Sequence, residues 1–103
     1  MTNCVAIYQP DTRVYVLGLR GHATGSERVC AAISGLVYAL AGFLANDEDT
    51  EMLAQWMEPG DVSLQFICGE RGKAALQLVL IGLMQIEKAH PDYIKTKISE
   101  EIF

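Results

Sequence analysis

The alternation of apolar and polar residues predicts a β-hairpin at the start of the chain. Residues 2–8 alternate, with Val5 and Ile7 as the apolar face. Residues 14–19 alternate along a run rich in β-branched and aromatic side chains, which pack well on a pleated strand surface. A proline and an aspartate lie between the two runs, and both residue types favour turns. Two such strands joined by a short polar turn are typical of a hairpin.

Two longer stretches have the three- to four-residue spacing of helices. In residues 27–45, one helical face carries Cys30, Ser34, Val37 and Ala41. In residues 73–89, the apolar stripe consists of Ala75, Leu78, Val79, Gly82, Leu83 and Ile86. Pro91 follows the second stretch and predicts that the helix has ended by that point.

Three shorter segments complete the predicted elements. Residues 50–57 have helical spacing of the apolar residues Met52, Leu53, Trp56 and Met57. Residues 62–67 and 93–98 alternate, which predicts two more strands, and the last one has the outward lysines of an edge strand. Residues 69–72 are predicted to be a charged connector.

The order of these elements predicts an α+β fold. Two long helices and about four short strands fit a two-layer sandwich, in which the helices cover a small mixed or antiparallel sheet. The chain has 103 residues, a length typical of one domain, so we expect residues 1–103 to form a single domain.

Composition narrows the class of function. Half of the residues are hydrophobic and the formal net charge is −5, and without a cluster of Lys and Arg we expect no nucleic-acid partner. Residues 29–45 are almost uncharged, near the lower length limit for a membrane span, but we interpret them as a buried helix. Three cysteines without metal-ligand spacing and the lack of a leader segment favour a reduced, cytoplasmic protein with no metal and no cofactor.

Cys30 and His22 are the candidate catalytic residues. Cys30 lies in the first turns of a predicted helix, where the positive end of the helix dipole favours a thiolate. His22 lies at the end of a predicted strand, a short loop away, and an imidazole there can manage the proton of a nucleophilic thiol. The alternative for Cys30 is a small apolar residue on a buried helix face, and for His22 a surface loop residue.

Two neighbours of this pair have a plain and a functional interpretation. Glu27 is either a first-turn acid that complements the dipole or a carboxylate that orients His22. Ser34, one turn after Cys30, either bonds a backbone carbonyl or lines the site. The helix has two candidate N-caps, because Thr24 and Glu27 have the spacing of a capping box and Ser26 is a competing cap.

These residues resemble the signature of the ribosomal-processing cysteine protease family, Prp. The signature consists of a Gly-His-Ala unit, a short loop, an acid, and Cys-Ala followed by a serine. In this chain those positions are Gly21, His22, Ala23, Glu27, Cys30, Ala31 and Ser34. The run from Ile81 to Lys95 is also similar to the closing helix and strand of the family.

The resemblance implies a small cytoplasmic cysteine endopeptidase that acts as a homodimer. Its substrate would be the N-terminal extension of a ribosomal large-subunit protein, or a related bacterial or phage protein. Cys30 would be the nucleophile and His22 the base and acid, with Glu27, Ser34, Gly21 and Ala23 in support. The loop from Ala23 to Val29 is shorter than usual in the family, and Glu27 stands where Asp is usual.

Two other functions remain open from the sequence. The same fold with its shortened loop could be a non-catalytic or divergent binding module that recognises a protein tail. A redox sensor is disfavoured because no resolving cysteine lies close to Cys30 in sequence. For a homodimer, the exposed half of the long apolar helix face is the candidate interface.

Overall fold

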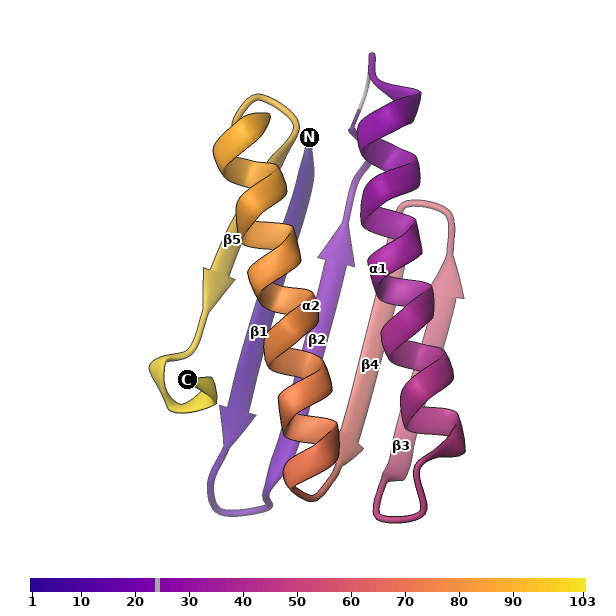
Figure 1. The fold of residues 1–103 in the computed structure, drawn as a ribbon, viewed down its shortest axis with the longest axis vertical. Helices are drawn as coiled ribbons and strands as arrows, with labels where there is room; N and C mark the ends of the chain where they lie inside the picture. The colour runs from indigo at the N-terminus through magenta and orange to yellow at the C-terminus, as the bar shows by residue number, and fades with distance from the viewer. Residues whose placement is uncertain (24) are drawn as a thin grey trace.

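The computed structural model describes residues 1–23 and 25–103. It contains five strands, two long helices and a short 3-10 helix (Figure 1). In chain order these are β1 (Thr2–Gln9), β2 (Val14–Arg20), α1 (Glu27–Asn46), β3 (Glu51–Glu58), β4 (Asp61–Ile67), α2 (Glu70–Ala89), β5 (Ile94–Ile98) and η1 (Glu100–Ile102).

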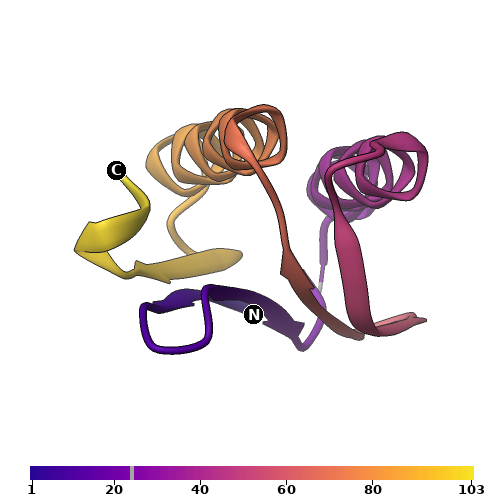
Figure 2. The ribbon, with the colours of Figure 1, turned by 90° about the horizontal axis from the view of Figure 1, so that it is seen from below.

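The five strands form one mixed sheet in the order β3-β4-β2-β1-β5. Strand β5 pairs parallel to β1, whereas the other neighbouring strands are antiparallel. Figure 2 shows that both helices lie on the same side of the sheet and that the opposite face is uncovered. The predicted α+β two-layer sandwich is therefore confirmed, with a mixed sheet.

The core lies between the sheet and the helix layer. Its largest fully buried side chains include Leu17, Leu40, Leu44, Leu64, Phe66, Leu76, Leu80, Leu83 and Ile94. The helices approach closely where Leu36 of α1 packs on Gly82 of α2, since a β-carbon at Gly82 would lie 2.9 Å from Leu36 Cδ1. This sandwich holds the ends of β2 and α1 in fixed positions.

Ser26 caps the N-terminus of α1. Its backbone is extended, and its Oγ accepts a hydrogen bond from the Val29 amide at 3.2 Å, the pattern by which a serine satisfies a first-turn donor. The competing cap at Thr24 lies outside the described residues. By length and composition α1 could cross a membrane, a property that it shares with core helices of soluble proteins, and its buried residues belong to the core.

Strand β3 covers Glu51–Glu58, so the short helix predicted over residues 50–57 is wrong. Strand β3 pairs antiparallel with β4, and the register shifts between Met52 and Ala54. The shift adds one residue to β3, which puts Met52 opposite Phe66 and Met57 opposite Val62, on the helix-covered side. Two inward residues five positions apart break the two-residue period of a regular strand, and this break conceals the strand in the sequence.

Several further predictions need correction. The connector at residues 69–72 is the cap and first turn of α2, which begins at Glu70 after Gly69. In α1 the buried stripe runs through Val29, Ile33 and Val37, so Cys30 and Ser34 lie beside the core face rather than on it. Leu78, predicted in the apolar stripe of the second long helix, is exposed on α2. Val5 and Ile7, predicted to form the apolar face of the first strand, are exposed on β1.

Candidate active site

A cavity of about 260 Å³ opens where β2, α1 and the β3–β4 turn meet. Strand β2 leads into it at Gly21 and His22, and α1 contributes one side, which includes Cys30 and Ser34. The turn between β3 and β4 forms the opposite wall. The lining of this cavity also includes Thr2, Leu19, Ile33, Val37, Tyr38, Met57, Glu58, Pro59, Gly60, Asp61 and Val62.

Cys30 is fixed in the cavity by the start of α1. Its amide donates to the Ser26 carbonyl at 3.2 Å, the first hydrogen bond of the helix ladder. Its thiol donates to the Ala23 carbonyl, with 3.7 Å between Sγ and the oxygen. Since Ala23 directly follows His22 and is buried, this bond ties the thiol to the segment that carries the imidazole.

His22 reaches the cavity because a left-handed glycine follows β2. Gly21 has φ +90°, and a β-carbon there would lie 2.3 Å from the Met1 carbonyl oxygen. Only glycine adopts this conformation readily. The Gly21 amide donates to the Gly60 carbonyl at 2.9 Å, which joins the end of β2 to the β3–β4 turn.

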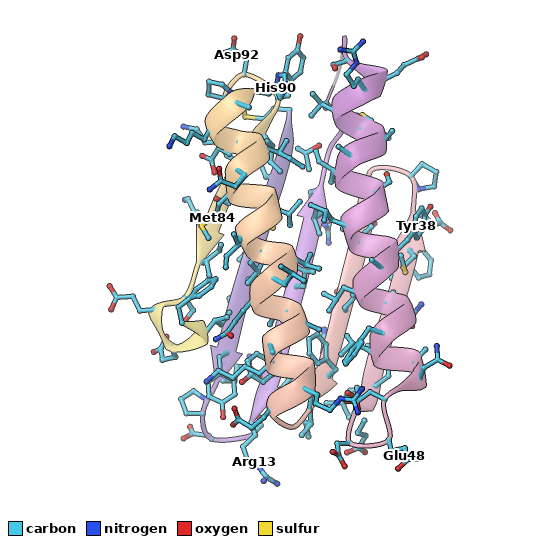
Figure 3. All side chains as sticks on the ribbon, viewed as in Figure 1. Arg13, Tyr38, Glu48, Met84, His90 and Asp92 are labelled. Atoms are coloured by element: carbon cyan, nitrogen blue, oxygen red, sulfur yellow. The ribbon has the colours of Figure 1, made fainter. Side chains whose placement is uncertain are left out.

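Figure 3 shows Tyr38, another lining residue, on the side of α1 that lies over β3 and β4.

The structure brings most of the sequence-predicted site residues together. Cys30, His22, Ser34 and Gly21 all line the cavity. Ala23 is buried behind them and holds the thiol through its carbonyl. Glu27 is exposed in the first turn of α1 and is not among the described residues that line the cavity.

Sequence reasoning missed the wall formed by the β3–β4 turn. The residues Pro59, Gly60 and Asp61 carry a turn signal, but the helix predicted over residues 50–57 concealed the hairpin to which the turn belongs. The register places Asp61 opposite Arg20, and the Arg20 guanidinium contacts the Asp61 carboxylate at 3.1 Å. The Arg20 and Asp61 side chains are 77% and 42% exposed, so this ion pair adds little to the stability of the fold.

The other two thiols lie outside this cavity. Burial, followed by the charge of Glu87, raises the pKa of Cys4 to about 12. Burial is also the largest cause that raises the pKa of Cys68, to about 11. Within residues 1–23 and 25–103, no group of three or more His, Cys, Asp or Glu side chains could hold a metal ion.

Comparison with solved structures found close likenesses in fold. The essential ribosomal processing protease Prp from S. aureus, in complex with a covalently linked product peptide, is 17% identical, with a TM-score of 0.81 over 96% of this chain and 100% of that chain. The same protease with a substrate peptide is 15% identical, with a TM-score of 0.74 over 96% and 100% of the two chains. SMU.848 from Streptococcus mutans is 21% identical, with a TM-score of 0.73 over 95% and 96%.

Sequence comparison gives the family. A search of curated proteins found no match. The family model described as cysteine protease Prp matches residues 1–95, a range that includes the cavity, both long helices and four of the five strands. The resemblance drawn from the signature residues is thereby confirmed, and the chain belongs to the cysteine protease Prp family.

Proposed function

We propose that this protein is an endopeptidase that removes the N-terminal extension of a ribosomal large-subunit protein, with Cys30 as nucleophile and His22 as base and acid. One observation carries the residue assignment: in a member of a cysteine protease family, a thiol and an imidazole line the same cavity. The S. aureus relative, which has a covalently linked product peptide, supports a peptide substrate and a covalent intermediate for this chain.

The proposed reaction has two steps. The Cys30 thiolate attacks the scissile carbonyl carbon, and His22, which holds the thiol proton, donates it to the departing amine. The product of this step is a thioester between Cys30 and the N-terminal part of the substrate. His22 then takes a proton from water, the hydroxide attacks the thioester, and the thiol is regenerated as the acid product leaves.

The start of α1 offers donors for the oxyanion that forms in both steps. The first-turn amides of a helix have no carbonyl partner within the helix. In α1 the Val29 amide bonds Ser26 Oγ and the Cys30 amide bonds the Ser26 carbonyl. Among the described residues, the amides of Glu27 and Arg28 remain as first-turn donors, and although neither residue lines the cavity, we assign oxyanion stabilisation to this end of the helix.

Two polar neighbours take supporting roles in this proposal. Ser34 lies one turn after Cys30 and lines the cavity, where its hydroxyl can bond the substrate or the imidazole. Glu27 is exposed at the positive end of α1. We propose that its carboxylate interacts favourably with the helix dipole and does not orient His22.

Peptide cleavage tests the proposal. The purified protein is incubated with a peptide that spans the junction between the extension and the mature ribosomal protein, and the products are identified by mass spectrometry. We expect one cut by the wild type, no cut by Cys30→Ala or His22→Ala, and wild-type cleavage by Cys68→Ala, the matched control. Full cleavage by Cys30→Ala would refute the assignment.

A binding module is the second candidate. The shortened segment between His22 and Cys30 and the position of Glu27 outside the cavity favour it. Such a module would bind the extension peptide and leave it intact. Retention of the uncut peptide by both the wild type and Cys30→Ala, measured by calorimetry, would support this second function.

We propose a cytoplasmic homodimer as the working form. The expected interface is the exposed surface of the helix layer, because the two most exposed of the large apolar side chains in the described residues belong to the two helices. These are Leu78 of α2, 70% exposed, and Tyr38 of α1, 66% exposed. Large apolar side chains exposed on one layer are typical of an interaction surface.

A further inference from the structure

The imidazole of His22 lies directly against Gly60 in the β3–β4 turn. A β-carbon placed on Gly60 would lie 2.3 Å from His22 Nε2, 2.7 Å from Cε1 and 2.9 Å from Cδ2. These three atoms are the nitrogen and its two ring neighbours, so the Nε2 end of the ring occupies the space that any other residue at position 60 would fill. Real β-carbons do not approach heavy atoms this closely, because van der Waals repulsion is steep at such distances.

The contact lies beside a hydrogen-bonded connection between the turn and the end of β2. Gly60 accepts a hydrogen bond from the Gly21 amide at 2.9 Å, and Gly21 is the residue before His22. On the other side of Gly60, the Asp61 carboxylate contacts Arg20 at 3.1 Å. The two residues before His22 therefore contact Gly60 and the residue that follows it.

The backbone conformation of Gly60 also favours a residue without a side chain at this position. Its φ is +74°, in the left-handed region that glycine adopts without steric cost. This conformation closes the β3–β4 hairpin, and the missing side chain leaves room for the ring. Pairing of β3 with β4 requires the left-handed backbone at Gly60, but it does not require the space that the missing side chain leaves for the ring.

We propose that Gly60 is a positioning residue for catalysis, and that it sets the location of the His22 imidazole in the cavity. The proposal rests on the proposed role of His22 as base and acid. A side chain at position 60 would push the ring away from its place beside the β3–β4 turn. Catalysis depends steeply on such geometry, and a displacement of about 1 Å can reduce a rate by about a hundredfold.

A double-mutant cycle on thermal stability tests the contact without reference to activity. We expect Gly60→Ala to lower the melting temperature of the wild type more than it lowers that of His22→Ala, because removal of the ring leaves room for the methyl group. Equal losses in both backgrounds would overturn the proposal. If Gly60→Ala alone does not fold, folding of the double variant supports the contact, and failure of both refutes it.

Gly25→Ala controls for backbone strain. Gly25 also has a positive φ, +92°, but a β-carbon there would meet only the Tyr93 ring, at 4.0 Å, among the described residues. We therefore expect its loss of melting temperature to be the same with and without His22. If the loss of melting temperature caused by Gly25→Ala depended on His22 as strongly as the loss caused by Gly60→Ala, backbone strain rather than contact with the ring would explain the coupling.

Kinetics then separate positioning from substrate binding, since Gly60 also lines the cavity. We expect Gly60→Ala to reduce kcat at least about tenfold with a smaller change in KM. An unchanged kcat, or a rise in KM alone, would overturn the proposal. A wild type that cleaves no peptide would refute the proposed function, and with it the catalytic role of Gly60, whereas the stability cycle would still report the contact.

Discussion

At the scale of single residues, the three cysteines occupy three different environments. Cys4 of β1 is buried in the core, Cys68 is half-buried before α2, and Cys30 lies beside the core at the cavity. Burial raises the pKa of Cys4 to about 12 and that of Cys68 to about 11. Because the thiolate is the reactive form, neither of these two thiols is suited to be the nucleophile at neutral pH.

Alkylation should therefore distinguish the thiols. With iodoacetamide at pH 7.5, we expect Cys30 to be labelled first, since it lines an open cavity, and Cys4 and Cys68 to remain largely unlabelled. A pKa of about 11 leaves well under about 0.1% of a thiol ionised at that pH. Peptide mapping by mass spectrometry gives the order, and the unfolded chain provides the control. Labelling of Cys68 as fast as Cys30 would contradict this account.

Alkaline pH should destabilise the fold through Cys4. The pKa of this thiol is raised from 9.0 to about 12 in the folded protein, so between these values the unfolded chain loses a proton that the folded chain keeps. The stabilising contribution is complete below pH 9 and is lost as the pH rises toward 12. Urea midpoints measured from pH 8 to 11 should fall, and the Cys4→Ala variant should show a smaller decrease. Identical slopes would exclude this cause.

That His22 and Cys30 line one cavity was predictable from sequence, but the groups around them were not. A short loop between a strand end and a helix start limits how far apart His22 and Cys30 can lie. The contact of His22 with Gly60, by contrast, depends on the pairing of β4 with β2. No local pattern reports strand order, so the turn could be identified from its residues but could not be placed.

At the scale of elements, glycine has opposite effects at two positions in the helices. A β-carbon at Gly42 in α1 would meet nothing within 4 Å. A β-carbon at Gly72 in α2 would lie 2.6 Å from Cys68 Cβ and 2.9 Å from its sulfur. Glycine is therefore required for close packing at the start of α2, whereas in α1 it only lowers helix propensity.

Alanine substitutions should reveal this difference. Gly42→Ala should raise the free energy of unfolding by about 0.5–1 kcal/mol, because alanine favours a helix. Gly72→Ala should lower it by about 1–3 kcal/mol through overpacking. Urea denaturation of the two variants provides the measurement. A stabilised Gly72→Ala variant would show that α2 can move away from Cys68 without loss.

Periodicity predicted six of the eight elements, and its failures have physical causes. The long helices and the alternating strands carry a clear repeat. The bulge between Met52 and Ala54 destroys the repeat in β3, so tertiary pairing with β4 decides the structure there. The start of α2 was missed because Gly69 and Gly72 resemble a loop, although Gly72 is buried against Cys68.

At the scale of the whole molecule, two surfaces could bury apolar area against another chain. One is the helix layer, with Leu78 and Tyr38 exposed, and the other is the uncovered sheet face, where β1 exposes Val5 and Ile7 (Figure 2). The side chains on the helix layer are more exposed, which favours that layer as the dimer interface.

Sedimentation velocity tests the location of the interface. We expect a dimer for the wild type, a monomer for Leu78→Glu, and a dimer for Ile7→Lys, because a charge placed in an apolar interface opposes association. A dimer that Ile7→Lys disrupts and Leu78→Glu does not would assign the interface to the sheet face.

In the proposed reaction, peptide cleavage passes through a thioester on Cys30, and trapping that adduct is the decisive experiment. The wild type is mixed with the extension peptide, quenched in acid within milliseconds to seconds, and digested at low pH for mass spectrometry. We expect the N-terminal product to be linked to the fragment that contains Cys30. Cleavage without an adduct there, or an adduct on Cys68, would contradict the proposed reaction.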